Sequence, residues 1–403
     1  VTKMKNMFYN ARSFNQPLND WIVSNVKDMS YMFYNAESFN QPLDKWDVSN
    51  VTKMKNMFYN ARSFNQPLNN WNMSNVTDIR GMFAHATSFN QNQNLNNANY
   101  NHWPLNQGAF LNWQTSPESS LADSDDSSLA DSDDESVDSL SAGAITEQES
   151  VDSLSGGAIT EEQAKEIAEA MPNDILKTYV LPVIRYPLLD KFIHRAVDRY
   201  LSRNPLRRNS VLQRFGEIEN WDVSRVTNMR RLFQSRAGGA QRFNRPLNKW
   251  DVSNVTDMQG MFKDAISFNQ PLDNWNVGNV TTMRSMFARA SKFNQPLNSW
   301  NVSNVTYMTA MFFRAIDFNQ PLNDWNVSNV KDMFCMFQEA KSFNQPLNKW
   351  NVSKVKCMYA MFAGASSFNQ PLNKWNVSNV TIMYAMFNEA WSFNQPLHAP
   401  WYV

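Results

Sequence analysis

Cysteine and glycine are scarce in this 403-residue chain, which has only two cysteines and eleven glycines. Two cysteines, Cys335 and Cys357, are too few for a disulfide framework. The glycines form neither a G-x-x-x-x-G-K-[ST] nor a G-x-G-x-x-G loop, so the sequence offers no backbone cradle for phosphate. Net charge is also missing, because 37 basic and 37 acidic residues balance. No global charge therefore attracts nucleic acid or an anionic membrane.

Residues that could carry catalysis are equally sparse. The four histidines are single and scattered, without H-E-x-x-H or Cys/His metal spacing, and no nucleophile elbow occurs. Four aspartates share one repeat position, which suggests calcium: Asp28, Asp78, Asp257 and Asp332. Other residue types fill that position elsewhere, including Lys53 and Ile382, which argues against a ligand ladder. We expect a protein that is not an enzyme and that takes no cofactor, metal or small-molecule substrate.

A 25-residue repeat occupies most of the chain. Tryptophan recurs at this spacing, with one gap of 29: Trp21, Trp46, Trp71, Trp221, Trp250, Trp275, Trp300, Trp325, Trp350 and Trp375. The shared sequence is P-L-x-x-W-x-V-S-x-V-x-x-M-x-x-M-F-x-x-A-x-x-F-N-Q. Its L-x-x-W-x-V part predicts a short parallel strand, and the apolar spacing of three or four that follows predicts a short helix or 3₁₀ arc. One such turn cannot bury its own apolar face, so turns must stack.

Two sets of repeated side chains admit a binding or a structural role. The tryptophan column could bind sugars, but its presence in every turn favours a stacked core. Asn-Val-Thr at 254–256 and Asn-Val-Ser at 301–303 match the glycosylation acceptor pattern. Since these asparagines belong to the repeat itself, hydrogen bonding to corner backbone groups is the favoured interpretation. We expect both sets to hold the stack together.

The expected fold class is a repeat solenoid, leucine-rich-repeat-like and α/β, with a small α-helical cap subdomain. We place a first solenoid of four turns at 1–113, an acidic low-complexity linker at 114–159, the cap at 160–216 and a second solenoid of seven turns at 217–403. Residues 115–163 hold fourteen acidic residues and no Lys, Arg or aromatic residue. That composition is typical of disorder, and a solvated spacer is favoured over a phosphorylated segment.

A helix is predicted within 188–205, with one apolar stripe that we assign to capping the second solenoid: Leu189, Phe192, Ile193, Ala196, Val197 and Tyr200. Five arginines cluster here as a basic patch: Arg195, Arg199, Arg203, Arg207 and Arg208. Such a patch can bind phosphate or RNA. The acidic linker that precedes it favours neutralisation within the chain or by an identical neighbour instead.

The repeat resembles a known family. The stretch "WDVSNVTDMQGMFKDAISFNQPLDNW" (250–275) is similar to the BspA-type repeat, a leucine-rich-repeat-like module of bacterial surface proteins with protist and giant-virus members. The resemblance covers about residues 1–95 and 217–401. It implies adhesion or protein–protein contact and supplies no catalytic residues. Residues 171–184 also look faintly like the start of an F-box, which would imply an adaptor.

We therefore expect a non-enzymatic repeat scaffold for protein–protein contact or adhesion, in a cell-surface or virion-surface assembly. The alternative is an intracellular, cytoplasmic adaptor that recruits partners through the solenoid. Expected partners are other protein chains of an assembly, including copies of this chain. No nucleic acid and no membrane span are expected. Because the first and last residues fall within a repeat, head-to-tail stacking between molecules is a further expectation.

One repeat position predicts the contact surface. The residue after the first Met of each arc is mostly polar, but it becomes Phe334, Tyr359 and Tyr384 in the last three turns. Contiguous exposed aromatic side chains are typical of interfaces. We predict that these three residues, with Trp391, contact a partner chain. The alternative is that the rings only support one another.

Overall fold

The computed structural model describes residues 4–68, 70–89, 187–234 and 239–397. The chain divides into two compact units. One comprises Val1–Gln114 with Arg185–Val403, so it contains both repeat arrays, and the other is Thr115–Ile184. The expected linker at 114–159, the F-box-like segment at 171–184 and residues 160–186 of the expected cap lie outside the described residues.

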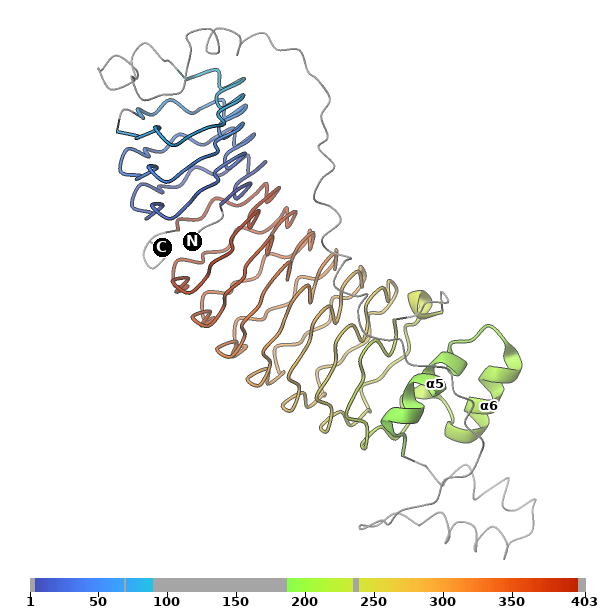
Figure 1. Cartoon of the computed structure of the whole chain (residues 1–403). Coiled ribbons are helices and arrows are strands. Elements are labelled where there is room, and N and C mark those ends of the chain that lie inside the picture. The colour runs from blue at the N-terminus through green and yellow to red at the C-terminus, as the bar shows by residue number, and fades with distance from the viewer. Residues whose placement is uncertain (1–3, 69, 90–186, 235–238, 398–403) are drawn as a thin grey trace, which may run out of the picture. The chain divides into compact units, whose positions relative to one another are not determined.

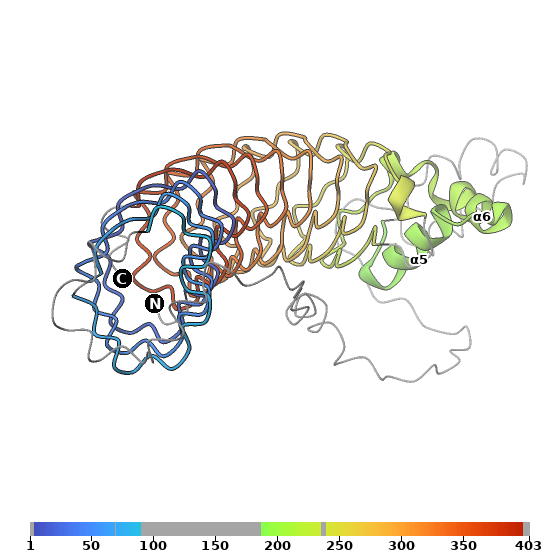
Figure 2. The same ribbon diagram turned by 90° about the horizontal axis from the view of Figure 1, so that it is seen from above.

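The unit with both arrays is a stack of 25-residue turns (Figures 1 and 2). Backbone amides of one turn donate to carbonyls of the next, as from Phe33 to Met57 over 2.8 Å. Parallel bridges form at the residue before the first Met of each arc, for example between Lys53 and Asp78. The sequence predicts a short strand at L-x-x-W-x-V. In the described residues this segment contains turns and no strand.

The arc after this bridge consists of overlapping turns where the sequence predicts a helix or 3₁₀ segment. In the first turn, Met7 N donates to Met4 O, and Ala11 N donates to Phe8 O. The third residue of each of these turns has positive φ, 59° at Asn6 and 56° at Asn10, which is typical of type II turns. A left-handed residue cannot continue a helix. The amides of both left-handed residues are instead free to donate to the next turn.

Equivalent residues of successive turns, here called a column, build the core. The tryptophans of the repeat are buried, and most indoles donate to a leucine carbonyl of the preceding turn, as from Trp46 to Leu18 over 2.8 Å. The phenylalanines stack within and between turns, with centroids 4.1 Å apart for Phe33 and Phe39 and 5.4 Å apart for Phe33 and Phe58. The structure confirms the core interpretation of the tryptophan column, because these rings are closed to solvent.

The repeated asparagines also hold neighbouring turns together, as expected. Asn40 Oδ1 accepts from Asn65 N and from Gln66 Nε2 of the next turn. In the glycosylation-like triplets, Asn254 Nδ2 donates to Ser224 O, and Asn301 Oδ1 accepts from Ser303 N. These bonds satisfy polar groups at the corners, between turns for Asn40 and Asn254 and within one turn for Asn301.

In the described part of the chain two helices precede the second array, α5 (Asp190–Tyr200) and α6 (Pro205–Phe215), followed by the short 3₁₀ helices η3 (Ile218–Asn220) and η4 (Ala240–Arg242). Asn204 caps α6 through bonds from the amides of Leu206 and Arg207, and Pro205 occupies its first position. The sequence therefore marks this boundary correctly with Asn204 and Pro205.

Helix α5 covers the first turn of the second array. The ring of Tyr200 meets Trp221 edge-on at 5.6 Å. The Asp190 carboxylate accepts from Thr227 N, Thr227 Oγ1 and Asn228 N at 2.6 to 3.0 Å. The apolar stripe is narrower than expected, because Leu189 and Phe192 are 37% and 44% exposed, while the other four predicted residues are buried.

The first array stacks on the last turn of the second array. Three amides of the last turn, those of Ala385, Phe387 and Glu389, donate to carbonyls of the first turn at 3.1, 3.0 and 2.7 Å. In Figure 1 the blue turns accordingly follow the red ones. We call this contact the joint. The stack thus runs from α5 through residue 397 to residue 4 and on to residue 89, an order that differs from the order in sequence.

Candidate functional site

The three aromatic residues predicted from the last three turns form one ladder. Rings of Phe334 and Tyr359 stack at 4.7 Å, and those of Tyr359 and Tyr384 at 5.0 Å, each pair 9° from parallel. All three side chains are half-buried. They pack against small side chains of the neighbouring columns: Ala310, Cys335, Ala360, Ala363 and Ala385. We call these three rings the C-terminal ladder, and their geometry leaves ring surface in contact with solvent.

The joint continues this ladder with polar residues of the first turn. Lys5 occupies the same column as Tyr384, and its Nζ lies 5.7 Å from the centre of that ring. Asn6 Nδ2 donates to the Tyr384 hydroxyl over 3.2 Å. A cation over a ring face is attracted by the ring's quadrupole. The first turn therefore fixes the last ring of the C-terminal ladder.

A second ladder lies on the first array, in a column four residues further along the arc. Tyr9 and Tyr34 stack at 4.7 Å, and Tyr34 and Tyr59 at 4.5 Å, each pair 4° from parallel. Tyr31 leans on Tyr9 and Tyr34, and Lys55 Nζ lies 5.5 Å from the Tyr31 ring. We call Tyr9, Tyr34 and Tyr59 the N-terminal ladder. Sequence reasoning missed it, although the signal was present as a Tyr after Met-Phe in three successive turns.

The two ladders occupy six consecutive turns of the stack, because the turn of Tyr9 follows that of Tyr384 across the joint. Together with Tyr31 we call them the aromatic surface. Their half-buried rings are held by neighbours above and below, so little side-chain freedom remains to be lost on binding. The arrangement suits contact with a large, partly apolar surface.

Burial perturbs two tyrosines of the N-terminal ladder, Tyr9 and Tyr34. It raises the pKa of Tyr34 to about 12, with further contributions from Tyr9 and Tyr59 on either side. Burial also raises the pKa of Tyr9, and the Glu389 carboxylate across the joint adds to this. At neutral pH these phenols are therefore protonated and can donate hydrogen bonds to a partner.

Trp391 was predicted to join the contact residues. It is 53% exposed, but it stands in a different column from either ladder, the column of Arg12 and Ile266. Ile266 is also exposed. The structure thus brings Phe334, Tyr359 and Tyr384 together and places Trp391 at a separate position of the arc.

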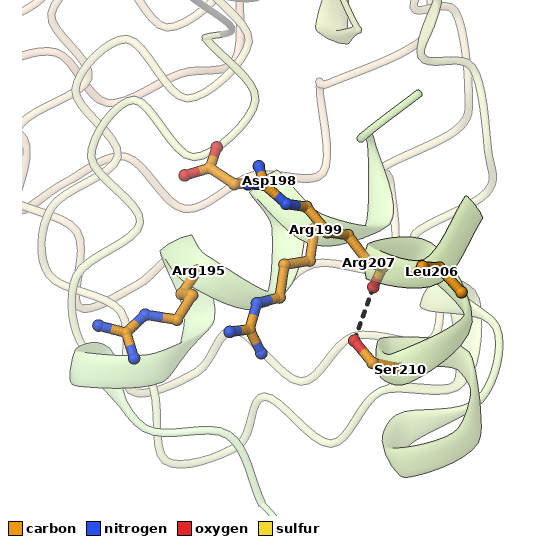
Figure 3. Close-up of a pocket in the computed structure, with 6 residues that line it drawn as sticks. All are labelled: Arg195, Asp198, Arg199, Leu206, Arg207 and Ser210. Atoms are coloured by element: carbon orange, nitrogen blue, oxygen red, sulfur yellow. Dashed lines mark hydrogen bonds between the residues drawn. The ribbon is translucent and has the colours of Figure 1, made fainter. Parts of the chain in front are cut away.

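The predicted basic patch lies on the helical cap, where it surrounds a hollow of about 590 Å³. Figure 3 shows Arg195, Asp198 and Arg199 of α5 facing this hollow. Leu206, Arg207 and Ser210 of α6 complete its lining. The remaining two arginines lie outside it: the guanidinium of Arg208 lies 5.3 Å from the Tyr200 ring, and Arg203 is exposed between the helices. The hollow is open and carries a net positive charge.

Candidates for metal or thiol chemistry are limited in the described part of the chain. There, no group of three His, Cys, Asp or Glu side chains is placed to hold a metal ion. Cys335 and Cys357 are free thiols, and burial raises the pKa of both, so that thiolate is suppressed at neutral pH. Among the same residues no helix has the length and apolarity needed to cross a membrane.

Comparison with known proteins identifies a family. A family profile described as "Mycoplasma protein of unknown function, DUF285" matches residues 1–98, 206–321 and 296–401, which is more than half of the chain. No curated protein and no solved structure matches the chain. The matched ranges contain both arrays, the joint and both ladders. The chain therefore belongs to the DUF285 family.

Proposed function

We propose that this chain is a non-enzymatic, leucine-rich-repeat-like scaffold that binds another protein chain through the aromatic surface. The observation that carries the proposal is the arrangement of the rings, which form two stacks of three on six consecutive turns and remain half-buried. Tyr and Phe remove large areas from water at a low cost in side-chain entropy, which is why they dominate binding hot spots. The partner belongs to a cell-surface or virion-surface assembly.

Charge at the aromatic surface adds selectivity to this contact. Lys5 lies beside Tyr384 and Lys55 beside Tyr31, and tyrosine hydroxyls supply polar groups next to apolar ring faces. The partner's complementary surface accordingly contains apolar side chains together with carboxylates or backbone carbonyls. The basic hollow of the cap lies on α5 and α6, in front of the second array, and is a separate feature.

Site-specific photo-crosslinking in native cells tests the proposal. A benzoylphenylalanine at position 359 or 34 stands within a ladder, whereas one at the exposed Lys374 stands in another column and serves as control. We expect positions 359 and 34 to capture the same protein and position 374 not to capture it. Capture of identical proteins from all three positions, or no capture from 359 and 34, would contradict the proposal.

A matched variant separates binding from folding. Preceding turns carry polar residues in the column of the C-terminal ladder, namely Gln259, Arg284 and Thr309. The combined change Phe334→Gln, Tyr359→Arg and Tyr384→Thr therefore uses residues that this column already accommodates. We expect the variant to keep its circular dichroism spectrum and to lose capture from position 34, because both ladders bind one partner. Unchanged capture by the folded variant would show that the C-terminal ladder takes no part.

A further inference from the structure

The joint repeats the bonds of the arc that connect two turns continuous in sequence. Within the second array, the amides of Ala360, Phe362 and Gly364 donate to the next turn at 2.9, 3.0 and 2.7 Å. The three amides at the joint do so at 3.1, 3.0 and 2.7 Å. These three arc amides are therefore paired at the joint as they are inside an array, whereas the bond that Ser392 N makes to Ser366 O has no equivalent between Ser13 and Trp391.

Side chains at the joint follow the same pattern. Asn394 Oδ1 accepts from Asn15 N and Gln16 Nε2 at 3.0 and 2.9 Å, as Asn369 does from its own next turn at 2.9 and 3.1 Å. Phe8 stacks on Phe387 at 5.8 Å, and Phe362 stacks on the same ring at 5.9 Å. Each face of the joint is thus complementary to the other in the same way as two neighbouring turns of an array.

The faces of the joint nevertheless belong to segments that are far apart in sequence, since Trp21 and Leu397 are 376 positions apart. Within an array, by contrast, neighbouring turns are joined by the chain itself. The first array can leave the second without any turn inside either array being broken, and residues 90–186 still connect the two. Opening the joint exposes Phe8 and Phe14 on one face and Phe387 and Phe393 on the other, all fully buried when it is closed.

We propose that the joint is an exchange interface, which a second copy of this chain completes in place of the chain's own first array. The first array of each copy then stacks on the second array of the other, and every contact of the closed joint is kept. A reciprocal exchange gives a closed two-fold dimer, and a one-way exchange gives an open chain of copies. An open joint exposes its apolar faces to water, which raises the free energy. The dimer and the open chain of copies are therefore favoured over a monomer whose joint is open.

Protein concentration sets the balance between the two forms. Two sites linked within one chain meet at an effective concentration in roughly the millimolar range or below for long links. The closed monomer therefore dominates in dilute solution, and the exchanged form gains at high local concentration, as in an assembly. Because the joint must open first, exchange is slow when the chains are already folded and fast when they refold together.

Engineered cysteines distinguish the two forms. Asn10 Nδ2 and Glu389 Oε1 lie 3.4 Å apart across the joint, so Asn10→Cys and Glu389→Cys place two thiols face to face. The natural thiols are removed by Cys335→Ala and Cys357→Thr, residue types that the same columns carry at Ala360 and Thr282. One copy carries only Asn10→Cys, and the other carries only Glu389→Cys together with a mass tag.

The control pair is Asn35→Cys with Asn60→Cys, two facing positions within the first array whose side chains are bonded over 2.9 Å. After co-refolding and oxidation we expect a disulfide between the two copies of the joint pair, in a yield that rises several-fold with protein concentration. The control pair, split over two copies in the same way, should give none above background.

Three results would overturn the proposal. The first is a yield from the joint pair no higher than from the control pair at any concentration. The second is a concentration-independent yield. The third is failure of a single chain with both Asn10→Cys and Glu389→Cys to form its internal disulfide, while the double control variant Asn35→Cys/Asn60→Cys does form one. In that case the joint itself is absent.

Discussion

The indole Nε1–H of Trp21 donates to the carbonyl oxygen of Leu397 over 3.1 Å, although the two are 376 positions apart in sequence. Trp46 makes the equivalent bond to Leu18 within the first array at 2.8 Å. One repeated interaction therefore serves both within an array and across the joint. This equivalence makes the joint testable by paired substitutions.

Trp21→Phe should lower the free energy of unfolding by about 1–3 kcal/mol, because it keeps an aromatic ring in the column but removes the indole N–H that donates to the Leu397 carbonyl. Trp46→Phe removes the same kind of bond inside the first array and is the matched control. We expect similar losses from both in urea unfolding. A clearly smaller loss for Trp21→Phe than for Trp46→Phe would mean that the indole of Trp21 is not buried against Leu397.

Asp190→Asn should weaken the attachment of α5 to the second array. Burial alone would raise the pKa of Asp190, but hydrogen bonds from Thr227 and Asn228 outweigh it and lower this pKa. A depressed pKa in the folded state stabilises the fold above the unfolded pKa, near 4, and this contribution disappears as the pH falls below that value.

The measurement is the free energy of unfolding of wild type and Asp190→Asn at pH 7 and at acid pH. At pH 7 we expect a difference of about 1 kcal/mol, because solvent screens the hydrogen bonds of this exposed carboxylate, and a smaller one in acid. Asp198→Asn, on the exposed side of the same helix, should change stability little at either pH. A pH-independent difference for Asp190→Asn would contradict the role given to its charge.

The N-terminal ladder should make the fold sensitive to alkali. The pKa of Tyr34 is raised to about 12, so its stabilising contribution is complete below pH 10 and is lost as the pH rises through about 12. Ultraviolet absorbance of the phenolate should show a late-titrating tyrosine that disappears in Tyr34→Phe. Tyr9→Phe removes one neighbouring phenol and should move that late titration to lower pH. An alkaline titration unchanged by Tyr34→Phe would disprove the assignment.

The sequence predicts the repeat and its core well because the tryptophan and phenylalanine columns recur without exception in the inner positions. It predicts the arc poorly. The spacing of Met4, Met7, Phe8 and Ala11 fits a helix, but it fits equally well a series of turns in which Asn6 and Asn10 are left-handed. Only the bonds to the next turn, which depend on stacking, decide between these alternatives.

The part of the candidate site that could be predicted is the C-terminal ladder, because the residue type in its column changes from polar to aromatic. Phe334, Tyr359 and Tyr384 stand out because the preceding turns carry Gln259, Arg284 and Thr309 there. The N-terminal ladder has the same 25-residue spacing, but its place beside the C-terminal ladder could not be predicted. That place depends on the joint, where the first array follows the second in space and precedes it in sequence.

Hydrogen exchange at the backbone amides of the joint tests the account most directly. Ala385, Phe387 and Glu389 donate to Lys5, Met7 and Tyr9, whereas the equivalent amides one turn earlier, at Ala360, Phe362 and Gly364, donate within the second array. In dilute wild-type protein we expect the two sets to be protected to a similar degree. Exchange at 385, 387 and 389 at the rate of open amides, with 360, 362 and 364 still protected, would contradict the continuous stack.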